Sequence, residues 1–273
     1  MSGERSPVAR ERRHTLYFLE EARAFAPVFL DTEVDMGRVW RHRAAAAAAG
    51  RRYSVVSYVL HAGARVIAAH PQANSAIGGR LLPRTVTYSG ASAKLALDRR
   101  LDGRRVVLGA VLPDLDRADL DEVQRQVDHY RDGDPGVMPE FASLRALHRL
   151  PVPLGRALFR RATRPLAARA ARTGTFAVTS LGHRAVDGFH SVGGTTVTLG
   201  VGRVVDRPVV REGQVTVAPV MRLNLAFDHR VIDGAEAADV LTEIKERLEG
   251  FPETPEGGEG RSAGTAADAL TGR

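Results

Sequence analysis

An apolar strand runs directly into an amphipathic helix near the end of this chain. The strand is expected over VAPVMRLNLAFDH at 217–229 and the helix over 235–249, with HRVIDG at their junction. Five apolar residues share one face of the helix: Ala237, Val240, Leu241, Ile244 and Leu248. A buried strand followed at once by a one-sided helix predicts a sheet covered by helices.

Similar patterns occur upstream of this junction. Strands are expected at VFLDTEVDM (28–36), TFAVTSL (175–181) and TTVTLGVGRVV (195–205), and Asp102-Gly103 predicts the turn of a hairpin. Helices are expected over 38–49, after a Ser54 cap, and over 115–133, where Gly133 ends the last of them. An Arg-rich helical insert broken by prolines occupies 139–172. We therefore expect an α/β fold, an α+β two-layer sandwich with a mixed sheet, over residues 12–250.

The two ends differ in composition from this domain. Residues 1–11 are polar and are expected to be a flexible N-terminus, while residues 251–273 are expected to be a disordered tail. In that tail Phe251 and Leu270 are the only large apolar side chains. Phe251 is expected to pack on the last helix, and Leu270 alone is too little to anchor the chain in a large cage.

Composition excludes several classes of function. The chain has no cysteine, which rules out thiol nucleophiles, cysteine-ligated zinc and iron–sulfur clusters, and we expect no metal. No stretch approaches the roughly 18 apolar residues of a membrane span, and the start shows no signal-peptide core. We expect a cytoplasmic protein that has no membrane partner.

The net charge of +7 suggests nucleic-acid binding, but other features argue against it. Lys94 and Lys245 are the only lysines among 39 basic residues, and such a uniform excess of arginine indicates a compositional bias. Aromatic residues make up 5% of the chain, which is too few for base-stacking platforms. We expect no nucleic-acid partner.

The junction carries residues that are suited to catalysis. His229 ends the strand, where its backbone is held while the imidazole can point into a cleft, and a positioned histidine is a competent general base. Asp233, followed by Glu236, resembles a capping box. The structural alternative is that Asp233 only caps the helix and His229 is an ordinary core histidine. HRAVDG at 183–188 repeats the motif but leads into a loop, so His183 is the weaker candidate.

The chain resembles a known family in these residues. FDHRVIDGAEAADVL is similar to the DHRxxDGxxAAxFL signature of the dihydrolipoamide acyltransferases, the catalytic cores of 2-oxo acid dehydrogenase complexes. TFAVTSLG, FLDTEVDM, AAHPQANSAI and VVLGAVLPDLDRADLDEV resemble further family segments in the same order. The resemblance covers residues 12 to 250 apart from 139–172, and it implies a chloramphenicol acetyltransferase-like fold.

The resemblance also implies a role for particular residues. His229 matches the catalytic base, and Thr179 matches the hydroxyl residue that hydrogen-bonds the tetrahedral oxyanion, with Ser180 as the alternative if the register shifts by one. Asp233 matches the motif aspartate, which pairs with an arginine that corresponds to Arg12 or, second, Arg13. The family is a trimer with active sites between subunits, so we expect a free homotrimer in which His229 faces Thr179 of a neighbour.

Departures from the family guide the expected function. No lipoyl domain, and so no lipoyl group, is expected on this chain, and the Arg-rich insert replaces the family's usual segment before TFTISN. Its arginines are candidates for the phosphates of coenzyme A or for an acidic carrier protein: Arg156, Arg160, Arg161, Arg164, Arg169 and Arg172. The alternative is a solvated helix face.

Three functions follow as hypotheses. The first is a stand-alone, acyl-CoA-dependent acyltransferase that moves an acyl group, such as acetyl, to a hydroxyl of a small molecule or of an acyl carrier protein's cargo, as in tetronate-like natural-product biosynthesis. The second is a dihydrolipoamide acyltransferase core that receives its lipoyl arm from another chain. The third is a non-catalytic trimeric scaffold, against which the presence of His229, Asp233 and Thr179 counts.

Overall fold

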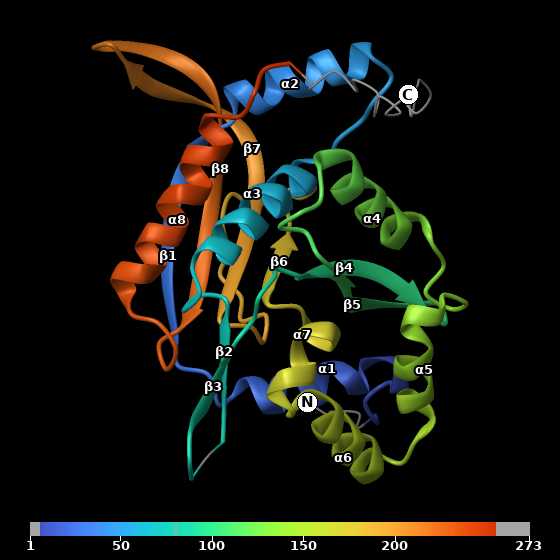
Figure 1. The fold of residues 1–273 in the computed structure, drawn as a ribbon. Helices are drawn as coiled ribbons and strands as arrows, with labels where there is room; N and C mark the ends of the chain where they lie inside the picture. Colours follow the sequence, from blue (N-terminus) through green and yellow to red (C-terminus); the bar gives the residue numbers. More distant parts are fainter. Residues whose placement is uncertain (1–5, 80, 255–273) are drawn as a thin grey trace, which may run out of the picture.

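A mixed six-stranded sheet forms the centre of the protein in a computed structural model that describes residues 6–79 and 81–254. The strand order is β1-β8-β7-β6-β4-β5. Pairs β4·β6 and β6·β7 are parallel, and the other neighbours are antiparallel. The strands are β1 (Pro27–Asp35), β4 (Ala93–Leu101), β5 (Arg104–Leu112), β6 (Phe176–Ser180), β7 (Val197–Arg211) and β8 (Gln214–Asp228). The predicted mixed sheet with helices is confirmed (Figure 1).

Helices cover this sheet on both faces, as Figure 1 shows. Helices α2 (Gly37–Ala48), α3 (Val55–Ala69), α4 (Leu120–Asp132) and α8 (Gly234–Glu249) pack over one face. Helices α1 (Arg13–Ala22), α5 (Ala142–Arg149), α6 (Val152–Thr163) and α7 (Leu166–Thr173) gather at the other side. Strands β2 (Ser75–Gly78) and β3 (Arg84–Thr87) form a separate hairpin, and 3-10 turns occur at Arg10–Arg12 and Pro139–Phe141.

The core lies between the first helix layer and the sheet. The predicted apolar stripe of α8 is buried there, together with Leu60 of α3 and Phe176 and Leu199 of the sheet. Each such side chain contributes about 1.5–3 kcal/mol when it leaves water. Phe251 is also buried, with its ring against Tyr58 and His42, so this residue packs next to the last helix as expected.

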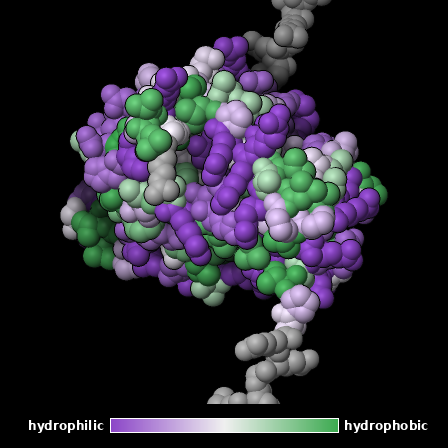
Figure 2. Space-filling view, turned by 90° about the horizontal axis from the view of Figure 1, so that it is seen from below, coloured by the Kyte–Doolittle hydropathy of each residue, from purple (hydrophilic) through white to green (hydrophobic). Residues whose placement is uncertain are grey.

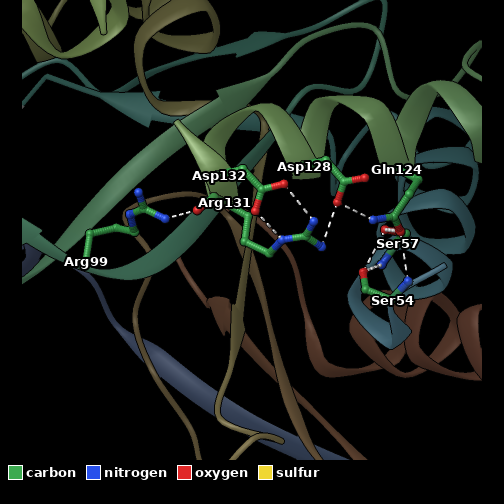
Figure 3. Close-up of polar contacts among 7 residues, drawn as sticks. All are labelled: Ser54, Ser57, Arg99, Gln124, Asp128, Arg131 and Asp132. Atoms are coloured by element: carbon green, nitrogen blue, oxygen red, sulfur yellow. Dashed lines mark hydrogen bonds and ion pairs between the residues drawn. The ribbon is translucent and has the colours of Figure 1, made fainter. Parts of the chain in front are cut away.

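A polar network joins the starts of two core helices (Figure 3). Ser54 caps α3, because its Oγ accepts a hydrogen bond from the backbone N–H of Ser57 at 3.1 Å. Gln124 of α4 accepts from the Ser54 backbone N–H (2.8 Å) and from the Ser57 hydroxyl (2.6 Å), and it donates to Asp128. The predicted Ser54 cap is therefore also a link between α3 and α4.

Short hairpins connect several strands. Asp102 and Gly103 have φ values of 50° and 77°, which confirms the predicted turn between β4 and β5. A second turn of this kind at Glu212 and Gly213 makes β7 and β8 longer than the sequence pattern suggested. The two strands project beyond the sheet as an arm, visible in orange in Figure 1.

The Arg-rich insert forms α5, α6 and α7 and packs on α1. Arg13 donates to the carbonyls of His148 (3.1 Å) and Leu150 (2.9 Å), and the Tyr17 hydroxyl donates to Val152. Gly155 permits this approach, since a Cβ there would lie 2.8 Å from the Tyr17 hydroxyl. The helices expected from the sequence are present, and their packing on α1 encloses a cavity described below.

At the N-terminal boundary, a 3-10 turn occupies Arg10–Arg12, so regular structure begins two residues before residue 12. Residues 1–5 and 255–273, which include most of the expected tail and Leu270, lie outside the described residues.

Candidate active site

The end of β8 and the start of α8 place His229 at the surface. Its backbone N–H donates to the Ala26 carbonyl at 2.9 Å, and its ring lies against Phe227. The side chain is 47% exposed. The sheet therefore fixes the backbone of this histidine while the imidazole faces outward, so the alternative that His229 is a core residue is wrong.

Asp233 lies beside this histidine. The distance from its Oδ1 to Nδ1 of His229 is 3.4 Å, which is longer than a usual hydrogen bond but within ion-pair range. Its side chain is 89% exposed and makes no cap hydrogen bond to α8. The carboxylate is thus placed to orient the imidazole and leave Nε2 free.

Two expectations for Asp233 are wrong in this chain. The capping box does not form, because Glu236 turns away and binds Nδ1 of His70 at 2.9 Å. The pairing with Arg12 is also absent among the described residues: Arg12 is exposed, and Arg13 holds the insert. Tertiary contacts give Glu236 and Arg13 other partners, and the spacing of residues along the chain does not reveal such contacts.

A buried carboxylate next to the histidine was missed by the sequence reasoning. Asp228 is 2% exposed and binds Arg230 through two oxygens, with contacts of 2.5 to 3.2 Å. It also accepts from the Ala26 backbone N–H at 3.3 Å. Such a bidentate pair fixes the turn that carries His229. The signal was present in the sequence as alternating charges in DHR.

Thr179 lies near the end of β6 and lines a large cavity. Neighbouring residues of a strand point to opposite faces, so Ser180 turns away from that cavity; its Oγ accepts a hydrogen bond from the Gly182 N–H. Of the two hydroxyl residues, Thr179 is thus the one whose side chain faces the cavity.

The strand register separates Thr179 from His229 within one chain. Thr179 pairs with Gly200, which pairs with Asn224, and His229 lies five residues beyond Asn224. At about 3.3 Å per residue, the two side chains are roughly 17 Å apart along the strands. They cannot act on the same reacting atom unless a second copy of the chain supplies one of them.

The repeated motif has a different structure. His183 lies exposed in the loop between β6 and β7, as expected. Asp187, at the position that corresponds to Asp233, pairs with Arg203 at 2.5 Å and Arg207 at 3.1 Å instead of with a histidine. The two copies of the motif therefore have similar sequences but different side-chain contacts.

The candidate coenzyme A arginines have several environments. Arg156 pairs with Glu20 of α1 at 2.8 Å, and Arg160 pairs with Glu21 at 2.8 Å. Arg161 is exposed. Two of the three leading candidates are thus already paired with carboxylates, which is how the insert docks on α1.

Residues 6–79 and 81–254 contain neither a metal-binding cluster nor a membrane-spanning helix. Within that span no group of His, Asp or Glu residues is arranged to hold a metal ion. No helix in the same span has the length and apolarity needed to cross a membrane. Figure 2 shows one end of the molecule, where hydrophilic side chains cover most of the surface.

Comparison with solved structures defines the class of fold. The structure matches a probable dihydrolipoamide acetyltransferase from Listeria monocytogenes with a TM-score of 0.69 and 18% identity, covering 92% of this chain and 96% of that one. Dihydrolipoamide acetyltransferase from Azotobacter vinelandii matches with a TM-score of 0.69 and 20% identity, covering 91% and 92%. The chain therefore has the fold of an acyltransferase catalytic domain.

Sequence comparison then matches part of the chain to a family. Residues 157–255 match the catalytic domain of the 2-oxoacid dehydrogenases acyltransferase family. Fifty residues are 50% identical to the dihydrolipoyllysine-residue acetyltransferase component of the pyruvate dehydrogenase complex of Bacillus subtilis, or 18% of this chain and 11% of that protein. The component from Staphylococcus aureus is 46% identical over 50 residues, covering 18% of this chain and 12% of that protein. Residues 157–255 are therefore similar to the catalytic domain of this acyltransferase family, and the chain aligns with about a tenth of the length of these relatives.

Proposed function

We propose that this protein transfers an acyl group between coenzyme A and the thiol of a dihydrolipoyl group, with His229 as the general base. The placement of His229 carries the proposal. The β8–α8 junction exposes its imidazole beside Asp233, and residues 157–255, which contain this junction, match the acyltransferase family.

The relatives favour a thiol acceptor over a hydroxyl. The Bacillus and Staphylococcus proteins are named for acetyl transfer to a dihydrolipoyl-lysine residue. The hydroxyl acceptor of a natural-product pathway, considered first from the sequence, has no such support among the named relatives. The second hypothesis from the sequence therefore becomes the leading one, with the lipoyl group as substrate.

His229 and Thr179 have complementary roles in the proposed transfer. The imidazole of His229 takes the proton of the attacking thiol, and the thiolate forms a new carbon–sulfur bond to the thioester carbonyl. The Thr179 hydroxyl donates a hydrogen bond to the resulting oxyanion, which is worth about 10²–10³ in rate for such donors. The old carbon–sulfur bond then breaks, and the leaving thiolate takes the proton back from the imidazolium.

The separation of His229 from Thr179 supports an oligomer in which both act at one site. We propose a homotrimer with each site between two subunits, since cyclic symmetry gives every copy one histidine side and one threonine side. One structural neighbour is described as the cubic core of a pyruvate dehydrogenase complex, which is an oligomeric assembly of that protein.

The test is a direct assay of acyl transfer. The protein is incubated with acetyl-CoA and either dihydrolipoamide, a small hydroxy acid, or a hydroxy acid on a carrier protein, and free coenzyme A is measured. Release that depends on dihydrolipoamide supports the proposal. Release that depends only on a hydroxyl acceptor would replace it with the natural-product function, and no release with any acceptor would favour the scaffold.

A further inference from the structure

The insert and α1 enclose a cavity on the sheet face that carries Thr179. Its volume is about 1320 Å³. The walls are largely apolar, and include Phe18 and Leu19 of α1 and Phe159 of α6. Its floor is β4, β5 and β6, where Lys94, Ala96, Ala177 and Thr179 face the same side. A cavity of this size and character is suited to a small ligand.

Lys94 extends its side chain within this cavity. The ammonium donates to the Gly193 carbonyl at 3.0 Å and lies 4.2 Å from the centre of the Phe18 ring. Gly109 leaves room for it, since a Cβ there would lie 2.8 Å from Cε of Lys94. An ammonium has three donors, and this one makes a single hydrogen bond among the described residues. Two donors therefore have no hydrogen-bond partner among the described residues, and Lys94 lines the cavity.

The neighbouring charges leave this lysine without an acid. Glu21 is the carboxylate among the described lining residues, and Arg160 and Arg164 hold it. Arg169 is enclosed nearby and donates to the Gly194 carbonyl at 2.9 Å, with no carboxylate partner in the described part of the chain. Lys94 and Arg169 thus place two positive charges on the carbonyls of consecutive residues. Enclosing both charges costs free energy unless an anion lies beside them.

We propose that this cavity receives an acyl group that ends in a carboxylate, and that Lys94 binds the carboxylate and so determines which acyl group is transferred. The inference rests on the proposed acyltransferase function, because it names the substrate class of that site. The step is binding only: the acyl carbon reacts at Thr179, and Lys94 remains unchanged.

Distances favour a short diacid. Lys94 lies two residues before Ala96, and Ala96 pairs with Thr179. Lys94 and Thr179 are therefore about 7 Å apart along the strand direction. Three carbon–carbon bonds span roughly 4–5 Å, and an ion-pair contact adds about 2.8 Å. A four-carbon diacid thioester therefore fits with its carbonyl at Thr179 and its carboxylate at Lys94. The phosphates of coenzyme A are separated from the thioester by the long pantetheine arm and do not fit this spacing.

The experiment compares succinyl-CoA with butyryl-CoA, which has the same chain length without the charge. Binding of each, and of free coenzyme A, is measured by calorimetry for the wild-type oligomer, for Lys94→Met, and for Lys245→Met as the control on the other lysine. We expect the wild type and Lys245→Met to prefer succinyl-CoA by at least about tenfold, the order expected of a hydrogen bond to a charged group. Lys94→Met should bind both thioesters equally.

The dependence of this preference on pH is measured on the wild type alone, so it does not need a folded variant. Burial, and then the charge of Arg169, lowers the pKa of Lys94 to about 8. The preference for succinyl-CoA should therefore decline as the pH rises from 7 to 9.5. The other charged or titratable lining groups are His14, Glu21, Arg164, Arg169, Arg172 and Arg230. Burial lowers the pKa of His14 below its usual value, so this imidazole is neutral throughout the range and does not produce the decline.

Each outcome separates the two proposals. Equal binding of the two thioesters by the wild type, or a preference that persists in Lys94→Met, overturns the role of Lys94. A loss in Lys94→Met that is equal for free coenzyme A and both thioesters also overturns it, because the lysine would then serve the phosphates. A preference lost in Lys94→Met without any transfer to dihydrolipoamide upholds the carboxylate site while the proposed acceptor fails.

Discussion

At the scale of single residues, exposure decides how the candidate catalytic groups respond to substitution. His229 and Asp233 face solvent in the described chain and make few packing contacts, while Asp228 and Arg230 beneath them are held by bidentate hydrogen bonds. We therefore expect different residues of the same short motif to carry function and stability, so that single substitutions can separate the two.

Replacement of His229 by alanine should reduce kcat by at least about a hundredfold, because a positioned general base typically contributes 10²–10⁴. The oligomer should persist, since the side chain is half exposed. His183→Ala is the matched control from the repeated motif and should retain nearly full activity. Steady-state acetyl transfer measures both, and equal losses at the two histidines would show that the choice between the motif copies is wrong.

Replacement of Asp233 by asparagine should lower activity with little effect on stability. The carboxylate is 89% exposed and caps nothing, so we expect the melting temperature to change by less than about 2 °C. Activity should fall because the imidazole loses the charge beside Nδ1. Calorimetry and the transfer assay give the two quantities. A large drop in melting temperature would restore the structural role that the sequence suggested for Asp233.

At the scale of elements, the loop between β6 and β7 lies directly on the sheet. Two glycines permit this contact. A Cβ on Gly193 would overlap Ala177, and a Cβ on Gly202 would overlap the Asp187 carbonyl. The same loop presents the carbonyl that binds Lys94. Backbone contact of this kind has no tolerance for a side chain.

Gly202→Ala should therefore lower the free energy of unfolding by about 1–3 kcal/mol, the usual cost of overpacking. Gly234→Ala is the control: nothing lies within 4 Å of its added Cβ, and alanine favours a helix over glycine, so its stability should be unchanged or higher. Urea unfolding of both variants checks the comparison. Equal stability of Gly202→Ala and the wild type would show that the loop can move off the sheet at no cost.

A second contact between elements depends on pH. His70, at the end of α3, binds Glu236 at 2.9 Å and Glu243 at 3.0 Å, both on α8. Burial lowers the pKa of His70, but the hydrogen bonds and charges of the two glutamates together outweigh it, so the pKa is raised in the folded protein. The protonated form thus stabilises the fold, fully below the ordinary pKa and progressively less as the pH rises through the folded value.

We expect the stability difference between wild type and His70→Gln to be larger at pH 6 than at pH 8.5. Using the difference cancels contributions from other histidines, such as His61, whose pKa burial lowers to about 4. Urea unfolding at several pH values supplies the measurement. A difference that is constant with pH, or that grows toward alkaline pH, would contradict the role of the two glutamates.

At the scale of the whole molecule, the proposed site requires more than one chain. Coexpression of His229→Ala with Thr179→Ala tests this directly, because a mixed oligomer contains interfaces where an intact His229 meets an intact Thr179. Random mixing should restore about a quarter of wild-type activity if sites lie between subunits. Each variant alone should stay nearly inactive, and light scattering should give a mass near three chains. Absence of complementation in oligomers shown to be mixed, or a fully active monomer, would overturn the shared site.

Much of the fold could be predicted from local patterns. The α8 stripe, the Ser54 cap and the Asp102-Gly103 turn are all specified by residues within a few positions of one another, and each was confirmed. The arm formed by β7 and β8 was only partly predicted, because its outer residues, such as Val210 and Val215, are exposed and pack on no core that would mark one face of a strand.

The candidate site, like the fold, could be predicted only in part from the sequence. The sequence by itself determined the resemblance to the acyltransferase family, the strand–helix junction that exposes His229, and the candidates Thr179 and Asp233, because motif spacing is a local property. Only the tertiary structure decided that Glu236 serves His70, that His229 and Thr179 lie too far apart in one chain, and that the insert encloses Lys94. Those outcomes depend on strand register and helix docking, which bring together residues far apart along the chain by burying surface that no short segment can bury alone.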